Sequence, residues 1–232
     1  MLTGPREVLP TAGAAADVSR VGWRLLLGGA YTSVAVASLP MAVEVATAAV
    51  LACGSDASML RLDLRADCVD LVVRTSPFEG LTAGGAALTA RISSAVRDLG
   101  LITSPRGTGN PAQVLEIAID AMNLDAVLPF WRAVFGYVVL ERPTGAGQHE
   151  LVATDPAGRG PTVWLQQLEA PRPQRNRVHF DLTVAEDEAE DRVSAVLAAG
   201  GRLVSDKNAR AFWVVADPEG NEVCICTWQD RD

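Results

Sequence analysis

Apolar and polar residues alternate in short runs along the first half of the chain, and two longer helical patterns interrupt them. "WRLLLGGAYTSVAV" places two apolar runs around Gly28-Gly29, which is typical of a β-hairpin. "PMAVEVATAAVLA" predicts a helix with Pro40 in its first turn. "MLRLDLRA" and "CVDLVVRT" predict a second strand pair, and "TAGGAALTARISSAVRDLG" a helix that Thr82 caps and Gly100 ends. The expected order is ββαββα, after a short N-terminal helix.

The second half predicts the order βαβββ twice. "VLEIAIDAMNLDAVLPFWRAVFGYVVLE" reads as strand, helix and strand, with Asn123 as N-cap and Gly136 as the stop. "HELVATD", an Asp-Pro-x-Gly turn at Asp155 and "TVWLQQL" complete the first copy. "RVHFDLTV", "EAEDRVSAVLAAGG", "RLVS", "AFWVVAD", a second such turn at Asp217 and "EVCICTW" repeat the order. Aligning the first strands or the turns gives nearly one offset, which indicates an internal duplication.

A segment without periodicity separates the two halves. "LITSPRGTGNPAQ" contains two prolines and two glycines, as linkers do. We therefore expect an α+β protein with a first domain over residues 1–103, a linker over 104–113 and a second domain over 114–232.

Composition narrows the function classes. The net charge of −8 argues against nucleic acid, whose phosphates attract a basic surface, and against an anionic membrane. Four cysteines without a CxxC pair favour a reducing, cytoplasmic location, and the N-terminus does not resemble a signal peptide. "AVASLPMAVEVATAAVLAC" is apolar enough to be tested as a membrane span, but Glu44 at its middle favours a soluble helix.

Strand alternation in the second half places chemically active side chains on one face of the predicted sheets. The other face is apolar and suits packing under a helix. The active face carries Glu116, Trp164, Gln166, His179, Asp181 and Cys224. A polar face can simply meet solvent, but this set favours the lining of a small-molecule cup. Trp131 and Trp213 are further candidates for contact with a ligand.

The second half resembles the glyoxalase-like branch of the vicinal oxygen chelate superfamily. The paired βαβββ order, "FWRAVFGY", "NRVHFDL" and "DPEGNEVCI" carry this resemblance. Metal-using members place ligands on the first and last strands of each copy, which are Glu116, Trp164, His179 and Cys224 here. Because Trp164 cannot bind a metal, we expect no metal cofactor. A three-ligand zinc site of Glu116, His179 and Cys224 stays open as the alternative.

The first half resembles pterin-4a-carbinolamine dehydratase. "GWRL" and "TSPFEGLT" carry the resemblance, over residues 21–101. Active members have a His-His pair, where Ser58 and Met59 stand here, and a third histidine, where Ser76 stands. The chain's two histidines, at 149 and 179, both lie in the second half. We therefore expect a degenerate domain that has lost the dehydratase chemistry and serves dimerisation, domain packing or another ligand.

The leading hypothesis is a lyase- or isomerase-type enzyme acting on a small organic molecule. His179 would act as acid or base with Glu116 or Asp181, without a metal, and Trp164 would form an aromatic wall. Gln166, Cys224, Trp131 and Trp213 would contact the ligand. The alternative is a binding or sequestering protein that uses the same cup without catalysis. A pterin dehydratase is a third and disfavoured hypothesis. We expect a homo-oligomer, a dimer for instance, that binds neither nucleic acid nor membrane.

Overall fold

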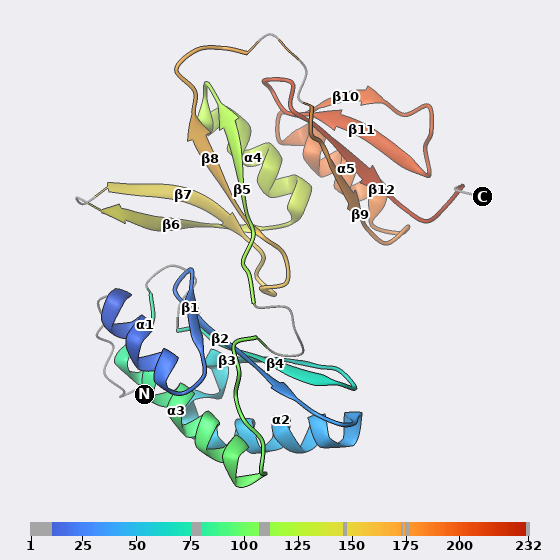
Figure 1. The fold of residues 1–232 in the computed structure, drawn as a ribbon. Helices are drawn as coiled ribbons and strands as arrows, with labels where there is room; N and C mark the ends of the chain where they lie inside the picture. The colour runs from blue at the N-terminus through green and yellow to red at the C-terminus, as the bar shows by residue number, and fades with distance from the viewer. Residues whose placement is uncertain are drawn as a thin grey trace. The chain divides into compact units, whose positions relative to one another are not determined.

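The structure is a computed structural model that describes residues 11–75, 80–106, 112–145, 148–172, 174 and 177–230. The chain divides into two compact units, Met1–Val114 and Leu115–Asp232 (Figure 1). The backbone of Ser104 pairs with that of Ser33 inside the first unit. The first unit therefore extends at least one residue past the boundary expected at 103.

A four-stranded sheet and three α-helices that share one hydrophobic core form the N-terminal unit (Figure 1). Its elements are α1 (Thr11–Arg20), β1 (Arg24–Leu26), β2 (Gly29–Ala35), α2 (Leu39–Cys53), a 3-10 helix (Gly54–Met59), β3 (Leu60–Leu64), β4 (Cys68–Val73) and α3 (Ala83–Asp98). The strands run antiparallel in the order β1-β2-β4-β3. The predicted ββαββα order, preceded by a helix, is confirmed. The side chain of Thr82 accepts a hydrogen bond from the Gly85 amide, as expected of an N-cap.

The helical segment Leu39–Met59, which includes α2, is long and apolar enough to cross a membrane by length and composition. In the structure, 22% of its most apolar window is buried. The buried residues of α2 belong to the core of the unit, as in a helix of a soluble protein: Ala42, Val45, Ala49 and Cys53. The opposite side of α2 exposes large apolar side chains: Leu39, Val43, Val50 and Leu51. The soluble interpretation of this segment therefore stays a prediction.

The positions that matter for dehydratase chemistry lie at the end of this helical segment. Ser58 and Met59 close the 3-10 helix, and Ser58 is exposed. Ser76 lies outside the described residues. The resemblance of this unit to the dehydratase family therefore also stays a prediction.

Two modules of the same topology form the C-terminal unit. The first module contains β5 (Glu116–Ala121), α4 (Leu124–Phe135), β6 (Val138–Gly145), β7 (Gln148–Thr154) and β8 (Thr162–Gln167). The second module contains β9 (Phe180–Thr183), α5 (Ala189–Ala198), β10 (Arg202–Ser205), β11 (Phe212–Ala216) and β12 (Glu222–Cys226). In each module the first strand pairs parallel with the last, giving the orders β5-β8-β7-β6 and β9-β12-β11-β10. The predicted duplication is thus confirmed in strand order and direction.

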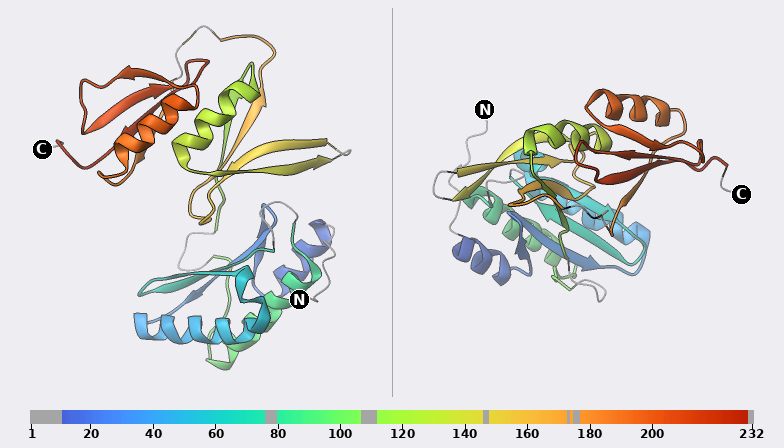
Figure 2. Two further views of the ribbon diagram at one scale, coloured as in Figure 1. Left: turned by 180° about the vertical axis from the view of Figure 1, so that it is seen from behind. Right: turned by 90° about the horizontal axis from the view of Figure 1, so that it is seen from above.

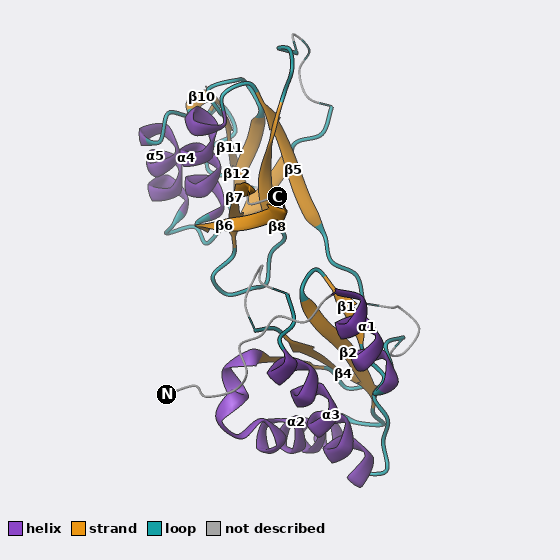
Figure 3. Ribbon diagram, turned by 90° about the vertical axis from the view of Figure 1, so that its left-hand side faces the viewer, coloured by secondary structure: helices purple, strands orange, loops and turns teal. Residues whose placement is uncertain are grey.

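Helices α4 and α5 lie side by side and cover one face of both sheets (Figures 2 and 3). Helix α4 begins at the N-cap Asn123 and ends at Gly136, whose left-handed backbone suits glycine, and both boundaries are as predicted. A single hydrophobic core joins the two modules and includes Phe130, Trp131, Val163, Val196, Val223 and Ile225. The opposite face of the two sheets is not covered by these helices and is called the open face below.

The repeated Asp-Pro-x-Gly sequence has a structural explanation. The Asp155 carboxylate accepts hydrogen bonds from the amides of Ala157, Arg159 and Gly160. The Asp217 carboxylate accepts from the amides of Glu219 and Asn221, from the Asn221 side chain and from the Trp131 indole. Each aspartate therefore satisfies the donors of the turn that feeds the last strand of its module.

Candidate functional site

Strand alternation places the predicted site residues on the open face. On β8, Val163 and Leu165 are buried, while Trp164 is half-buried and Gln166 is exposed. On β12, Val223 and Ile225 are buried, and Cys224 between them is half-buried. His179 and Asp181 are exposed and flank Phe180, which packs against the core. The predicted division into an apolar face and a chemically active face is confirmed for these strands.

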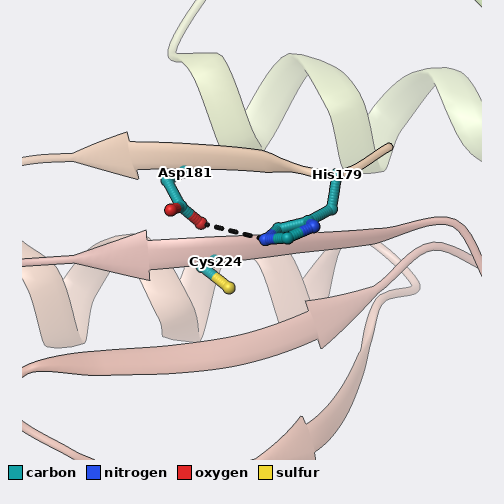
Figure 4. A group of neighbouring side chains, drawn as sticks. All are labelled: His179, Asp181 and Cys224. Atoms are coloured by element: carbon teal, nitrogen blue, oxygen red, sulfur yellow. Dashed lines mark ion pairs between the residues drawn. The ribbon is translucent and has the colours of Figure 1, made fainter. Parts of the chain in front are cut away.

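His179, Asp181 and Cys224 converge on the open face of the second module (Figure 4). Asp181 and Cys224 stand opposite each other in the parallel pairing of β9 with β12. His179 lies two residues before Asp181, so its side chain points to the same side of the strand. The Nε2 atom of His179 lies 3.5 Å from the Oδ1 atom of Asp181. One ligand atom from each of the three residues lies within 4.8 Å of the others.

The Cys224 thiol is strongly biased toward its protonated form. Burial and the hydrogen bond and negative charge of Asp181 raise the pKa of Cys224 from 9.0 to about 12. A thiol with this pKa donates a hydrogen bond and is a poor nucleophile near neutral pH. In this state Cys224 is better suited to holding Asp181 in place than to attacking a substrate.

A cavity of about 760 Å³ opens over this cluster. Its walls come from the second module and from the residues after β10 and β12, including Lys207, Asn208, Phe212 and Asp230. Lys207 and Asn208 add a cation and an amide that sequence reasoning missed. They lie between β10 and β11, where no periodicity indicates which strand face a side chain will approach.

A second cavity, of about 830 Å³, lies at the junction of the two modules. Its lining includes Asp120, Phe180, the connection around Arg172 and the turn at Glu219. The Glu219 carboxylate accepts hydrogen bonds from the amides of Met122 and Asn123, which ties the second module to the start of α4. Trp131 also lines this cavity, but only 1% of its surface is exposed. Its indole therefore offers little surface to a ligand.

Glu116 takes part in a different cluster from His179. Its carboxylate pairs with the Arg142 guanidinium, which also donates to Glu150 at 2.6 Å and lies 5.8 Å from the Trp164 ring centroid. Burial alone would lower the pKa of Arg142, but its bonds to Glu150 and Glu116 raise it. Glu116 is thus paired with Arg142 in the first module. The hypothesis of a Glu116–His179 pair would require Glu116 to contact His179 instead. The pairing of Arg142 with Glu150 across the β6–β7 hairpin was the signal that sequence reasoning missed.

The remaining predicted ligand contacts lie apart from the cluster. Trp164 stacks near Arg142, and Gln166 is exposed toward the end of β8. Trp213 is 8% exposed and belongs to the hydrophobic core. None of these three residues lines either of the two cavities.

The four positions that metal-using relatives would employ do not fit a metal here. Trp164 has no ligand atom, and the Glu116 carboxylate is neutralised by Arg142. Only His179 and Cys224 remain of that set.

Paired βαβββ modules with a common helical layer and an open face define a vicinal oxygen chelate fold. The sequence model of the family described as "Glyoxalase-like domain" matches residues 116–226, just under half of the chain. This part of the chain is therefore a glyoxalase-like domain. No curated protein sequence matches the chain.

Several solved structures resemble this half of the chain. A glyoxalase-related enzyme from Fulvimarina pelagi is 20% identical, with a TM-score of 0.39, and the match covers 50% of this chain and 87% of that one. The fosfomycin resistance protein FosX from Mesorhizobium loti is 12% identical, with a TM-score of 0.41 and coverages of 49% and 90%. A glyoxalase/bleomycin resistance protein from Albidiferax ferrireducens is 17% identical, with a TM-score of 0.38 and coverages of 50% and 98%. TM-scores this low add nothing to the assignment.

Proposed function

We propose that the glyoxalase-like domain is an enzyme that converts a small organic molecule by acid–base chemistry in the cavity of the second module. The observation that supports this proposal most is the contact between His179 and Asp181 at the cavity wall. A carboxylate beside an imidazole orients the ring. His179 would therefore transfer the proton, and Asp181 would position it.

The other residues that line the cavity would bind the substrate through polar and apolar contacts. Lys207 and Asn208 would bind an anionic or carbonyl group of the substrate, and Phe212 would contact its apolar part. The protonated thiol of Cys224 would keep Asp181 oriented through their hydrogen bond. The reaction class that this set favours is a lyase or isomerase reaction, in which a proton is removed from one atom and delivered to another. We keep the cytoplasmic location and the homo-oligomeric state as parts of the proposal.

A non-catalytic binding protein is the second candidate. The exposure of the pair favours it: the side chains of His179 and Asp181 are 54% and 64% exposed, respectively. An acid–base pair works best where water is excluded. A sequestering protein needs no such exclusion.

The two candidates differ in what the variant His179→Ala does. A panel of small organic acids, carbonyl compounds and epoxides, fosfomycin included, is first screened by thermal shift, and products of the binding compounds are followed by mass spectrometry. We expect His179→Ala to lower turnover on the order of 100-fold or more, the usual contribution of general acid–base catalysis, with affinity changed less than about tenfold. His149→Ala, in β7 of the first module, is the matched control and should leave turnover unchanged.

Binding without turnover in the wild-type protein would favour the sequestering candidate. Turnover that survives His179→Ala undiminished would overturn the acid–base proposal.

A further inference from the structure

We propose that the Asp230 carboxylate, held in place by Arg210, binds the amino group of a substrate whose acid group is bound by Lys207. The substrate class is then a small ω-amino acid, with an ammonium group at one end and a carboxylate at the other. This inference rests on the proposed function for the use of the cavity of the second module. It adds a recognition residue from outside the strands, and binding alone tests it.

Asp230 lines the cavity at the end that lies away from His179. Asp181 stands beside Cys224 in the pairing of β9 with β12, and Cys226 follows two residues further along β12. These residues and His179 all line the cavity. Residues two apart on a strand are about 6–7 Å apart, so the cavity runs along β12 from the His179 end toward Cys226. Asp230 belongs to the segment that follows Cys226 and therefore lies at the far end.

The buried side chain of Thr227 anchors this segment to the connection between β10 and β11. The Thr227 amide donates a hydrogen bond to the Ala211 carbonyl at 2.9 Å, and the Thr227 hydroxyl donates to the Arg210 carbonyl at 2.6 Å. The hydroxyl oxygen also accepts from the Gln229 amide at 3.0 Å. The backbone on both sides of the Arg210–Asp230 pair is therefore fixed without a ligand.

Arg210 orients the Asp230 carboxylate through two hydrogen bonds. Its Nε atom lies 3.0 Å from Oδ2 of Asp230, and its Nη2 atom lies 2.8 Å from Oδ1. Such a bidentate pair fixes the direction of the carboxylate as well as its place. The two side chains are 58% and 48% exposed, and an ion pair this exposed contributes little to stability. The position that the pair gives to the carboxylate at the cavity wall is therefore its main consequence.

The chemistry of the two ends defines the ligand. The hydrogen bond from Arg210 lowers the pKa of Asp230, so the carboxylate is ionised near neutral pH and only accepts hydrogen bonds. A carboxylate has about four acceptor sites, and Arg210 uses two of them. The other sites suit a charged donor, which an ammonium group provides. Lys207 lines the same cavity and offers the complementary charge to an acid group.

The test is binding of 4-aminobutanoate and 6-aminohexanoate to the full-length protein, measured by ligand-observed NMR titration. The matched probes are glutarate and pimelate, in which a carboxylate replaces the ammonium group. We expect at least one amino acid to bind about tenfold or more tighter than its dicarboxylate, the effect of one charge-assisted hydrogen bond. Asp230→Asn should weaken binding of that amino acid by a similar factor.

A charge exchange separates recognition from a merely structural role. The double variant Arg210→Asp/Asp230→Arg keeps an ion pair between the two positions but places the cation at position 230. Its preference should reverse, so that the dicarboxylate binds tighter than the amino acid. If the pair only braced the cavity wall, the double variant would keep the preference of the wild type.

Two control variants make the result specific. Asp63→Asn removes the partner of Arg65 in an ion pair of similar exposure in the N-terminal unit, and it should leave binding unchanged. His179→Ala should bind the amino acid as the wild type does, because recognition at Asp230 needs no proton transfer. Circular dichroism establishes that each variant is folded before its affinity is compared.

The inference is overturned if neither amino acid binds, if each binds no tighter than its dicarboxylate, or if the preference survives the charge exchange. Turnover is measured separately, with His179→Ala. Amino acid binding that depends on Asp230, in a protein without turnover, would support the inference and count against the acid–base proposal. The two proposals can therefore fail independently.

Discussion

The two Asp-Pro-x-Gly turns offer a matched pair of substitutions, Asp217→Ala and Asp155→Ala. Asp217 is 1% exposed and accepts a hydrogen bond from the Trp131 indole, which is equally buried, at 3.0 Å. Removing the carboxylate leaves that indole donor without its acceptor inside the core. Hydrogen bonds to a charged group contribute about 1.5–3 kcal/mol each, and an orphaned buried donor costs about 1–3 kcal/mol. We therefore expect Asp217→Ala to lower the free energy of unfolding by about 4 kcal/mol.

Asp155 makes a similar set of backbone bonds at the surface. Its donors, the amides of Ala157, Arg159 and Gly160, belong to exposed residues and can turn to water when the carboxylate is lost. We expect Asp155→Ala to cost only about 1 kcal/mol. The difference between the two substitutions reports on burial and on the Trp131 and Asn221 side-chain donors that bind Asp217, since the turn sequence is nearly the same.

Urea unfolding followed by tryptophan fluorescence measures this difference. Four of the five tryptophans lie in the C-terminal unit, so the signal reports mainly on that unit. In a Trp131→Phe background the donor is absent, and Asp217→Ala should then cost about 1–3 kcal/mol less. Equal costs for Asp155→Ala and Asp217→Ala, or an unchanged cost in the Trp131→Phe background, would refute this reasoning.

Two further predictions concern the open face. In chelator-treated protein, alkylation of Cys224 by iodoacetamide should be slow near neutral pH and accelerate as the pH rises from about 9 toward 12, because the raised pKa keeps the thiol protonated. Asp181→Asn removes one cause of the raised pKa and should speed the alkylation of Cys224 at a given pH. The rate is measured by mass spectrometry of the modified peptide. An unchanged rate would contradict the role of Asp181 in raising the pKa of Cys224. Arg142→Met leaves Glu116 and Glu150 facing each other in a half-buried place and should lower the free energy of unfolding by about 2–4 kcal/mol. Adding Glu116→Gln and Glu150→Gln should recover most of that loss in urea unfolding, and no recovery would mean that packing of the arginine stem dominates.

The order and boundaries of the elements were largely predictable from local patterns. Thr82, Asn123 and Gly136 mark helix ends through bonds and backbone conformations within a few residues, so the sequence contains their whole explanation. The division of each strand into two faces was predictable for the same reason, since alternation needs no knowledge of the neighbouring strand.

The composition of the site was predictable only in part, because it depends on which strands pair and on where long side chains reach. Asp181 lies in β9 and His179 directly precedes that strand, so their proximity follows from the alternation of side chains along an extended backbone. The ion pair between Glu116 and Arg142 cannot be predicted from alternation, because Arg142 reaches Glu116 from β6, at the far edge of the sheet. Trp131 and Trp213 were expected to contact a ligand from their residue type, yet both side chains are buried in the hydrophobic core.

The parallel pairing of first and last strands has a consequence for how the protein forms during synthesis. β9, which carries Asp181, is an edge strand whose ladder partner is β12, the last strand of its module. Such long-range pairing carries the entropy cost of closing a long loop and tends to fold slowly. A nascent chain therefore emerges with β9 unpaired until β12 has left the ribosome, whereas the first module can already be closed. A chain that ended before Glu222 would lack β12, so β9 would have no ladder and Asp181 would have no Cys224 beside it, although the deleted residues lie far from His179 and Asp181 in sequence.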